Sequence, residues 1–241
     1  MNRIPDVIKH LIIINIIMFV ATQAMPEQFY RLFAMHFPLN PNFRIWQIVT
    51  HMFMHGGFGH IAFNMYGLWA FGTPLEQIWG KKKFLIFYFA SGLGAIALYT
   101  GVQLYEFYHY MHQLEAAGLS KELVLNALHT NKVIPGFEQY IPILQKMMDI
   151  YKSILVGASG AIYGILVAFA FYFPNAELML IFIPYPIKAK YFVPLLIAAD
   201  FMFGITNALH TPVAHMAHVG GAITGFILMR TWQKHQFKRW N

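Results

Sequence analysis

The sequence predicts an all-α membrane protein in which six transmembrane helices form one bundle. Of its 241 residues, 58% are hydrophobic and only 11% are charged, and the mean hydropathy is +0.49. These values lie outside the range of soluble globular proteins. Apolar segments long enough for membrane helices recur along the chain, at residues 8–25, 57–77, 84–105, 153–173, 191–209 and 213–232. One polytopic membrane domain over residues 1–241 is therefore favoured over two soluble domains.

The first apolar segment resembles a signal peptide, because Arg3 and Lys9 precede the run Leu11-Ile12-Ile13-Ile14. Its end, Ala21-Thr22-Gln23-Ala24, lacks a clean A-x-A cleavage site. We therefore expect this segment to stay in the protein as its first helix.

The basic residues predict orientation and not a nucleic-acid partner. The formal charge is +7, but Lys and Arg punctuate the apolar segments and form no basic face. Placing both termini in the cytoplasm puts eleven of them inside: Arg3, Lys9, Lys81, Lys82, Lys83, Lys188, Lys190, Arg230, Lys234, Lys238 and Arg239. Six lie outside: Arg31, Arg44, Lys121, Lys132, Lys146 and Lys152. This bias fits the positive-inside rule.

Two connections between apolar segments are long, residues 26–56 and 106–152. The second is polar and predicts a helical extramembrane insertion on the outer side, between the third and fourth transmembrane helices. Residues 119–123 are a plausible helix start and Pro135-Gly136 a break, after which apolar residues recur at helical spacing, at Ile141, Leu144, Met148 and Tyr151. The insertion is either a cap packed on the outer bundle surface or a substrate-recognition element.

Ser159 lies in the short motif Gly157-Ala158-Ser159-Gly160, inside the fourth apolar segment. A polar residue is costly in hydrocarbon and usually faces a bundle interior or a watery cavity. The motif is not a G-x-S-x-G nucleophile elbow, because Ala161 stands where the second glycine belongs. Small residues also mediate helix packing in membranes, and Gly160 with Gly164 fits that alternative. Tyr163 follows Ser159 by one helical turn on the same face.

Two further sets of polar residues lie in other apolar segments. His218 precedes Gly221 and Gly225 on one helix face, with His215 one turn before it; this histidine is either structural or a proton-transfer group. His60 and Asn64 share a face of the second segment at i, i+4. They either stabilise helix contacts or direct donors at a developing oxyanion.

These three sets of polar residues have the same predicted depth in the membrane. Ser159, His218 and His60 each lie within a few residues of the outer end of their segments, which places them roughly 5–10 Å below the outer boundary at about 1.5 Å per residue. Unrelated structural residues are not expected to share one level, whereas a nucleophile, a base and oxyanion donors have to.

A third member of a catalytic triad is not evident. Glu76 lies about 24 Å along the helix from His60, near the inner face. Asp200 falls near the middle of its segment, too deep by this estimate to orient His218 directly. The residues therefore predict a Ser–His dyad, in which histidine activates serine and then protonates the leaving amine.

At this point the sequence resembles the rhomboid family of intramembrane serine proteases. The resemblance spans all six apolar segments. It rests on Trp46-Gln47-Ile48-Val49-Thr50-His51-Met52-Phe53-Met54-His55 followed by His60-Ile61-Ala62-Phe63-Asn64-Met65, on Gly157-Ala158-Ser159-Gly160-Ala161-Ile162-Tyr163-Gly164, and on Ala217-His218-Val219-Gly220-Gly221-Ala222-Ile223-Thr224-Gly225.

The resemblance implies a role for each matching residue. Ser159 would be the nucleophile and His218 the base. Tyr163 would stack under the imidazole, and Gly157 and Gly160 would support the site. The oxyanion hole would be lined by His60, Asn64 and the Ser159 backbone N–H. One departure is Gln47, where the family commonly has arginine, and this puts the stability of the first loop in doubt.

The implied activity is hydrolysis of a peptide bond in or next to a transmembrane segment of a single-pass substrate, near the outer face. No metal, nucleotide or redox cofactor is expected; the partners are transmembrane substrates and the lipid bilayer. The expected location is a bacterial plasma membrane, with both termini cytoplasmic.

Two other classes of function compete with a protease. Histidine pairs at His51/His55 and His215/His218 permit zinc ligation, but the chain has no H-E-x-x-H motif and no cysteine, and no acidic residue is expected level with these histidines. An inactive rhomboid relative that binds membrane proteins is the other alternative, and the retained Ser159 and His218 argue against it.

Access to the site also has two interpretations. The fifth segment holds Phe192, Phe201, Met202 and Phe203 and few small residues, so we expect it to be a mobile gate, with Leu209-His210-Thr211-Pro212 as a cap over the dyad. The alternative is that these aromatic side chains simply face lipid.

Overall fold

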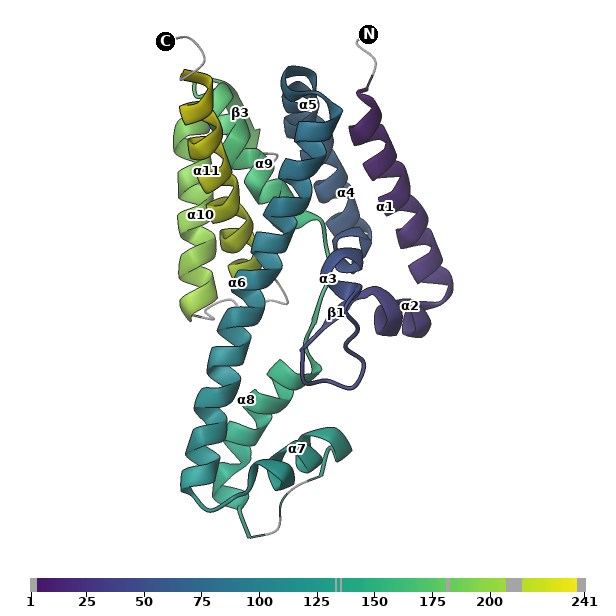
Figure 1. Cartoon of the computed structure of the whole chain (residues 1–241), viewed down its shortest axis with the longest axis vertical. Coiled ribbons are helices and arrows are strands. Elements are labelled where there is room, and N and C mark those ends of the chain that lie inside the picture. The colour runs from purple at the N-terminus through teal and green to yellow at the C-terminus, as the bar shows by residue number, and fades with distance from the viewer. Residues whose placement is uncertain (1–3, 133, 135, 181–182, 207–213, 238–241) are drawn as a thin grey trace.

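The computed structural model describes residues 4–132, 134, 136–180, 183–206 and 214–237, and these form a helical bundle with a smaller helical lobe (Figure 1). The bundle contains α1 (Asp6–Ala24), α4 (Phe58–Gly67), the π-helical η2 (Leu68–Gly72), α5 (Thr73–Trp79), α6 (Lys81–Ala116), α9 (Ser159–Tyr172), α10 (Ala189–Thr206) and α11 (His215–Phe237). The lobe contains α7 (Lys121–Thr130), η3 (Glu138–Tyr140) and α8 (Ile141–Lys152).

The first loop and a hairpin complete the fold. The loop contains α2 (Pro26–Phe33), β1 (Met35–His36), α3 (Gln47–Thr50) and η1 (His51–Phe53). β1 pairs in antiparallel fashion with β2 (Ile154–Leu155), so that Met35 lies opposite Leu155. The hairpin of β3 (Glu177–Leu180) and β4 (Ile183–Lys188) joins α9 to α10.

The starts of α1 and α6 and the end of α11 meet at one end of the bundle, opposite the lobe (Figure 1). Lys81 Nζ lies 2.6 Å from Asp6 Oδ2, and Lys83 Nζ lies 4.3 Å from the ring centroid of Trp232. At the same end Glu76 accepts hydrogen bonds from the N–H groups of Val7 and Ile8, at 3.0 and 2.9 Å. Its carboxylate therefore caps α1, whose first N–H groups have no partner within the helix.

α6 extends well past the predicted third segment. That segment was placed at residues 84–105, with the insertion starting at 106, but the helix runs without interruption for 36 residues. Phe107, Met111 and Leu114 are buried one helical turn apart, because their shared face packs into the core of the lobe. The helix therefore continues through residue 106, where the insertion was predicted to start.

The lobe has a hydrophobic core of its own, which α6, α7 and α8 build together and which Phe37 of the first loop enters. α7 begins where the sequence predicts a helix start, because the Ser120 side chain accepts a hydrogen bond from Leu123 N–H at 3.2 Å. The lobe packs along the extension of α6, so it continues the bundle lengthwise.

Glycines set how closely α9 and α11 approach. A Cβ at Gly221 would overlap the carbonyl group of Gly160, and a Cβ at Gly225 would lie 2.6 Å from Gly164 Cα. The predicted small-residue packing at Gly160 and Gly164 is confirmed. This packing holds together the two helices that carry Ser159 and His218. A packing role for the glycines is therefore compatible with a catalytic role for Ser159.

α9 starts later than the predicted fourth segment. Residues 153–158 are not helical, since the chain here leaves the lobe, pairs as β2 with β1 and enters the bundle only at Ser159 (Figure 1). The predicted boundary at residue 153 is therefore wrong by six residues.

Gln47, named above as a departure from the rhomboid resemblance, connects several parts of the first loop. Its side chain is fully buried. Nε2 donates to the carbonyl groups of Arg31 and Asn42, each at 3.0 Å, and Oε1 accepts from Arg44 N–H at 3.1 Å. A neutral amide thus satisfies several backbone groups of the loop without placing a charge there.

Replacing this amide should destabilise the protein. We expect Gln47→Leu to leave part-buried backbone groups of the first loop without a partner, at up to roughly 1–3 kcal/mol each, and hence to lower the midpoint of thermal unfolding by about 5–10 °C. Differential scanning fluorimetry in detergent measures this. Gln77→Leu, which changes an exposed glutamine, is the matched control. An unchanged midpoint for Gln47→Leu would show that the network does not stabilise the loop.

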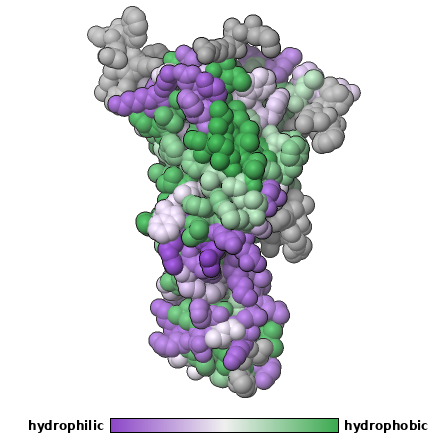
Figure 2. All heavy atoms as spheres, turned by 90° about the vertical axis from the view of Figure 1, so that its right-hand side faces the viewer, coloured by the Kyte–Doolittle hydropathy of each residue, from purple (hydrophilic) through white to green (hydrophobic). Residues whose placement is uncertain are grey.

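By length and composition, three helices in the described part of the chain are suited to cross a membrane, α1, α6 and α10, and α9 is apolar but shorter. Figure 2 shows apolar side chains over the bundle half of one face and a more hydrophilic lobe half. α1 contributes Ile13, Ile14, Ile17 and Val20 to the exposed apolar surface. How many helices cross the membrane stays a prediction.

Candidate active site

Ser159 and His218 come together at the starts of two tightly packed helices. Ser159 is the first residue of α9 and His218 lies in the first turn of α11. His218 Nε2 lies 2.9 Å from Ser159 Oγ, within hydrogen-bond distance. The His218 side chain is only 12% exposed. A hydroxyl and an imidazole at this distance are the elements of a nucleophile and a general base.

Tyr163 stacks on His218. The two ring centroids lie 4.2 Å apart and their planes differ by 10°, so the tyrosine ring fixes the plane of the imidazole. Tyr163 follows Ser159 by one turn of α9, which is why one helix can hold both residues against the same histidine.

Gly157 and His60 shape the space beside Ser159. Gly157 has φ +127°, a backbone conformation that side chains rarely adopt, and a Cβ there would lie 2.8 Å from His60 Nε2 and 3.6 Å from Ser159 Oγ. His60 Nε2 and Ser159 Oγ therefore lie near one point. The N–H of Gly157 donates to His51 O at 2.9 Å, so the first loop positions the chain before the serine.

The proton on His60 can be assigned from its partners. His60 Nδ1 accepts a hydrogen bond from Gly56 N–H at 3.3 Å, so in the neutral imidazole Nε2 carries the hydrogen. His60 is also held by His55, whose ring centroid lies 5.0 Å away in an edge-to-face arrangement. The His60 Nε2–H donor therefore lies close to Gly157, near the point that Ser159 Oγ also approaches.

Asn64 lies one turn below His60 and is buried. Its amide donates to His60 O at 2.8 Å and, among the described residues, makes no hydrogen bond to Ser159. Its place in an oxyanion hole stays a prediction. At Ser159 itself, the first backbone N–H groups of α9 have no partner within the helix, and such groups suit a developing negative charge.

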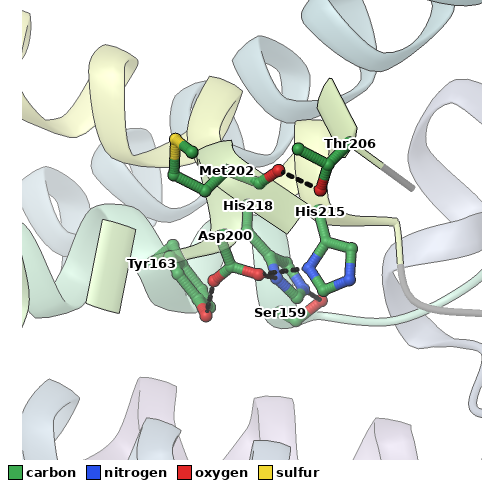
Figure 3. A network of polar contacts seen from close by, with 7 residues as sticks. All are labelled: Ser159, Tyr163, Asp200, Met202, Thr206, His215 and His218. Atoms are coloured by element: carbon green, nitrogen blue, oxygen red, sulfur yellow. Dashed lines mark hydrogen bonds and ion pairs between the residues drawn. The ribbon is translucent and has the colours of Figure 1, made fainter. Parts of the chain in front are cut away.

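The structure brings in an acidic residue that the sequence analysis placed too deep. Asp200 Oδ1 lies 3.3 Å from His218 Nδ1 and 2.5 Å from His215 Nδ1. Asp200 Oδ2 accepts a hydrogen bond from the Tyr163 hydroxyl. Figure 3 shows the carboxylate between Tyr163 and the two histidines.

The expectation that Asp200 cannot reach His218 is therefore wrong. Counted from the predicted helix end at residue 209, Asp200 lies about 14 Å deep, but counted from the last described residue of α10, Thr206, it lies about 9 Å deep. His218 lies about 5 Å below the start of α11. The two side chains span the remaining difference. The i, i+3 spacing of His215 and His218 was the one sequence signal that could have suggested a shared partner.

The same three residues could hold a cation. One ligand atom from each of Asp200, His215 and His218 lies within 4.8 Å of the others. The expectation that no acidic residue is level with these histidines is thus wrong as well. His51, one member of the other histidine pair considered for zinc, places Nδ1 2.9 Å from the carbonyl oxygen of Gln47.

The aromatic residues of α10 divide between lipid and the site. Phe201 is 46% exposed, as expected of a lipid-facing side chain, whereas the Phe203 ring centroid lies 5.7 Å from that of His215. The predicted cap at 209–212 lies outside the described residues, and the gate stays a prediction.

Comparison with known proteins agrees with this geometry. The family model described as "Rhomboid domain" matches residues 42–234, which include every residue of the site. The chain belongs to the rhomboid family. It is an integral membrane protein, as its apolar helices require.

Individual rhomboids match much of the chain. "Rhomboid protease AarA" of Providencia stuartii is 30% identical over 195 residues, which cover 76% of this chain and 54% of the relative. "RHOMBOID-like protein 12, mitochondrial" of Arabidopsis thaliana is 27% identical over 240 residues, 97% of this chain and 60% of the relative. "Rhomboid protein 1, mitochondrial" of Saccharomyces cerevisiae is 26% identical over 182 residues, 75% of this chain and 40% of the relative. The chain spans about half the length of the curated relatives it matches.

Proposed function

We propose that this rhomboid is an intramembrane serine endopeptidase that cleaves transmembrane protein substrates through Ser159 and His218. The observation that carries the proposal is the 2.9 Å separation of Ser159 Oγ and His218 Nε2 at the starts of two apolar helices. A relative named a protease supports the same reaction.

The reaction follows from the positions of the side chains. His218 Nε2 takes the hydroxyl proton as Ser159 Oγ attacks the scissile carbonyl carbon, and a tetrahedral oxyanion forms. His60 Nε2–H, the Ser159 N–H and Asn64 supply donors to that oxyanion. His218 then protonates the leaving amine, and a water activated by the same imidazole hydrolyses the acyl-enzyme. No step requires a metal or an organic cofactor.

The proposed substrate is a membrane-spanning helix near its outer end. A helix hides its carbonyl groups in i→i−4 hydrogen bonds, so the segment has to unwind before Ser159 can attack. Helix-breaking residues in the substrate favour this unwinding, and the resemblance to rhomboids implies a small residue before the scissile bond.

For the whole chain we propose one rhomboid membrane domain over residues 1–241, with six transmembrane helices and residues 106–152 on the outer side. Both termini then lie in the cytoplasm. This is supported by the contacts that group Asp6, Lys81 and Trp232 at one end of the bundle. We propose a bacterial plasma membrane as the location; relatives named mitochondrial make an organelle membrane the alternative.

A metal-binding function is the second candidate, because Asp200, His215 and His218 converge. The geometry favours the protease, since hydrogen bonds to one carboxylate account for both histidine Nδ1 atoms, and since a zinc site gives no role to the contact between Ser159 and His218.

One experiment separates the two functions. The purified protein, in detergent and with EDTA present, should cleave a fluorescently labelled single-pass transmembrane substrate, and a fluorophosphonate should block cleavage by labelling Ser159. Stoichiometric zinc in the purified protein together with activity lost on chelation would favour the metal site. Absence of any cleavage in lipid and in detergent would contradict the protease.

A further inference from the structure

We propose that Asp200 is a positioning residue for His218, so that the site works as a Ser159–His218–Asp200 triad. The proposal rests on the proposed protease function and deepens it. It joins three helices, because Ser159 lies on α9, Asp200 on α10 and His218 on α11 (Figure 3).

The carboxylate fixes which nitrogen of His218 carries the proton. An ionised carboxylate can only accept hydrogen bonds, so at the 3.3 Å contact His218 Nδ1 has to be the donor to Asp200 Oδ1. In the neutral imidazole Nε2 is then without hydrogen, and Nε2 is the atom that lies 2.9 Å from Ser159 Oγ. Asp200 thus selects the tautomer that can take the serine proton.

The carboxylate is itself held in place from both sides. The Tyr163 hydroxyl donates to Oδ2, while His215 Nδ1 approaches Oδ1 at 2.5 Å. Asp200 is 6% exposed, and a buried charge requires such partners. Because Tyr163 also stacks on His218, one residue constrains both the plane of the imidazole and the carboxylate that orients it.

The charge also acts during the reaction. When His218 accepts the serine proton it becomes an imidazolium, and a carboxylate in contact with Nδ1 stabilises that ion in a site shielded from bulk water. Removing the charge while keeping the shape should therefore slow the chemical step and leave substrate binding alone.

The test is the isosteric variant Asp200→Asn, assayed for kcat, KM and the rate at which a fluorophosphonate labels Ser159. We expect kcat and the labelling rate to fall together by roughly 10³–10⁴-fold, with KM unchanged. Asp200→Glu, which restores a carboxylate, should recover part of kcat. Asp149→Asn, the same change at an exposed position in the lobe, is the matched control and should behave as wild type.

Thermal unfolding of each variant separates positioning from folding. A normal midpoint with a slow labelling rate supports the triad. Wild-type kcat and labelling in Asp200→Asn would overturn it and leave a Ser–His dyad, provided that Ser159→Ala is inactive. A lower folded fraction in which the remaining folded protein shows wild-type kcat and a wild-type labelling rate would also overturn it, in favour of a structural role. Equal cleavage by wild type and Ser159→Ala would overturn the proposed function instead.

Discussion

Ser159→Ala and His218→Ala will each lower the rate of substrate cleavage by roughly 10⁵–10⁶-fold, and the double variant will be little worse than either. The two side chains share one hydrogen bond and, in the proposed mechanism, one proton transfer, so losing either is expected to remove the whole function. Folding should be intact in Ser159→Ala, because the change removes only a hydroxyl from a residue at the start of α9.

Matched variants make this result specific. Ser153→Ala and His129→Ala change the same residue types outside the site and should retain activity. Cleavage rates for purified proteins, normalised to folded protein from thermal unfolding, are the measurement. Wild-type cleavage by Ser159→Ala would show that another residue is the nucleophile.

His60→Ala will lower kcat by about 10²–10³-fold, the usual loss for one positioned oxyanion donor. The reason is the assignment of its proton: Nδ1 is occupied as an acceptor of Gly56 N–H, which leaves Nε2–H to donate near Ser159. Asn64→Ala should also reduce kcat, by less, because one of its amide hydrogens already serves the backbone of α4.

Steady-state kinetics with a transmembrane substrate measures both variants. KM should stay near the wild-type value, since in the proposed mechanism these donors contact charge that develops only in the transition state. His10→Ala, an exposed histidine at the other end of the bundle, is the control. A raised KM with normal kcat in both variants would place these residues in substrate binding and not in the oxyanion hole.

The approach of Ser159 and His218 could be predicted from the sequence because both lie near the outer ends of apolar segments. The helical rise explains this only in part, since residues 153–158 are not helical. Counting from the ends of apolar segments placed Ser159, His218 and His60 at one depth, and the structure brings Ser159 Oγ and His218 Nε2 to 2.9 Å. The same counting failed for Asp200, because it depended on where the fifth helix ends. Counted from Thr206, the last described residue of α10, and not from residue 209, the carboxylate lies about 5 Å nearer the outer end of its segment.

Other features depend on contacts that no local pattern reveals. The length of α6 is set by the lobe core around Phe107 and Met111, so a hydropathy boundary underestimates it. The role of Gln47 depends on carbonyl groups at Arg31 and Asn42, which are brought to it by the turns of the first loop. Glutamine in place of arginine removes a charge from the first loop, but the Gln47 amide makes neutral hydrogen bonds to several backbone groups there.

The glycine contact between α9 and α11 also has a consequence for motion within the site. Where main chain packs on main chain, as at Gly160 and Gly221, there are no side-chain rotamers, so this contact loses no side-chain entropy on folding. For the same reason, no side-chain rotamer exchange can loosen this contact on a fast timescale. The distance between the main chains that carry Ser159 and His218 can then change only when whole helices shift, a microsecond-to-millisecond motion. On the faster timescale of side-chain motion, the two helices hold the main chains of Ser159 and His218 at a fixed distance.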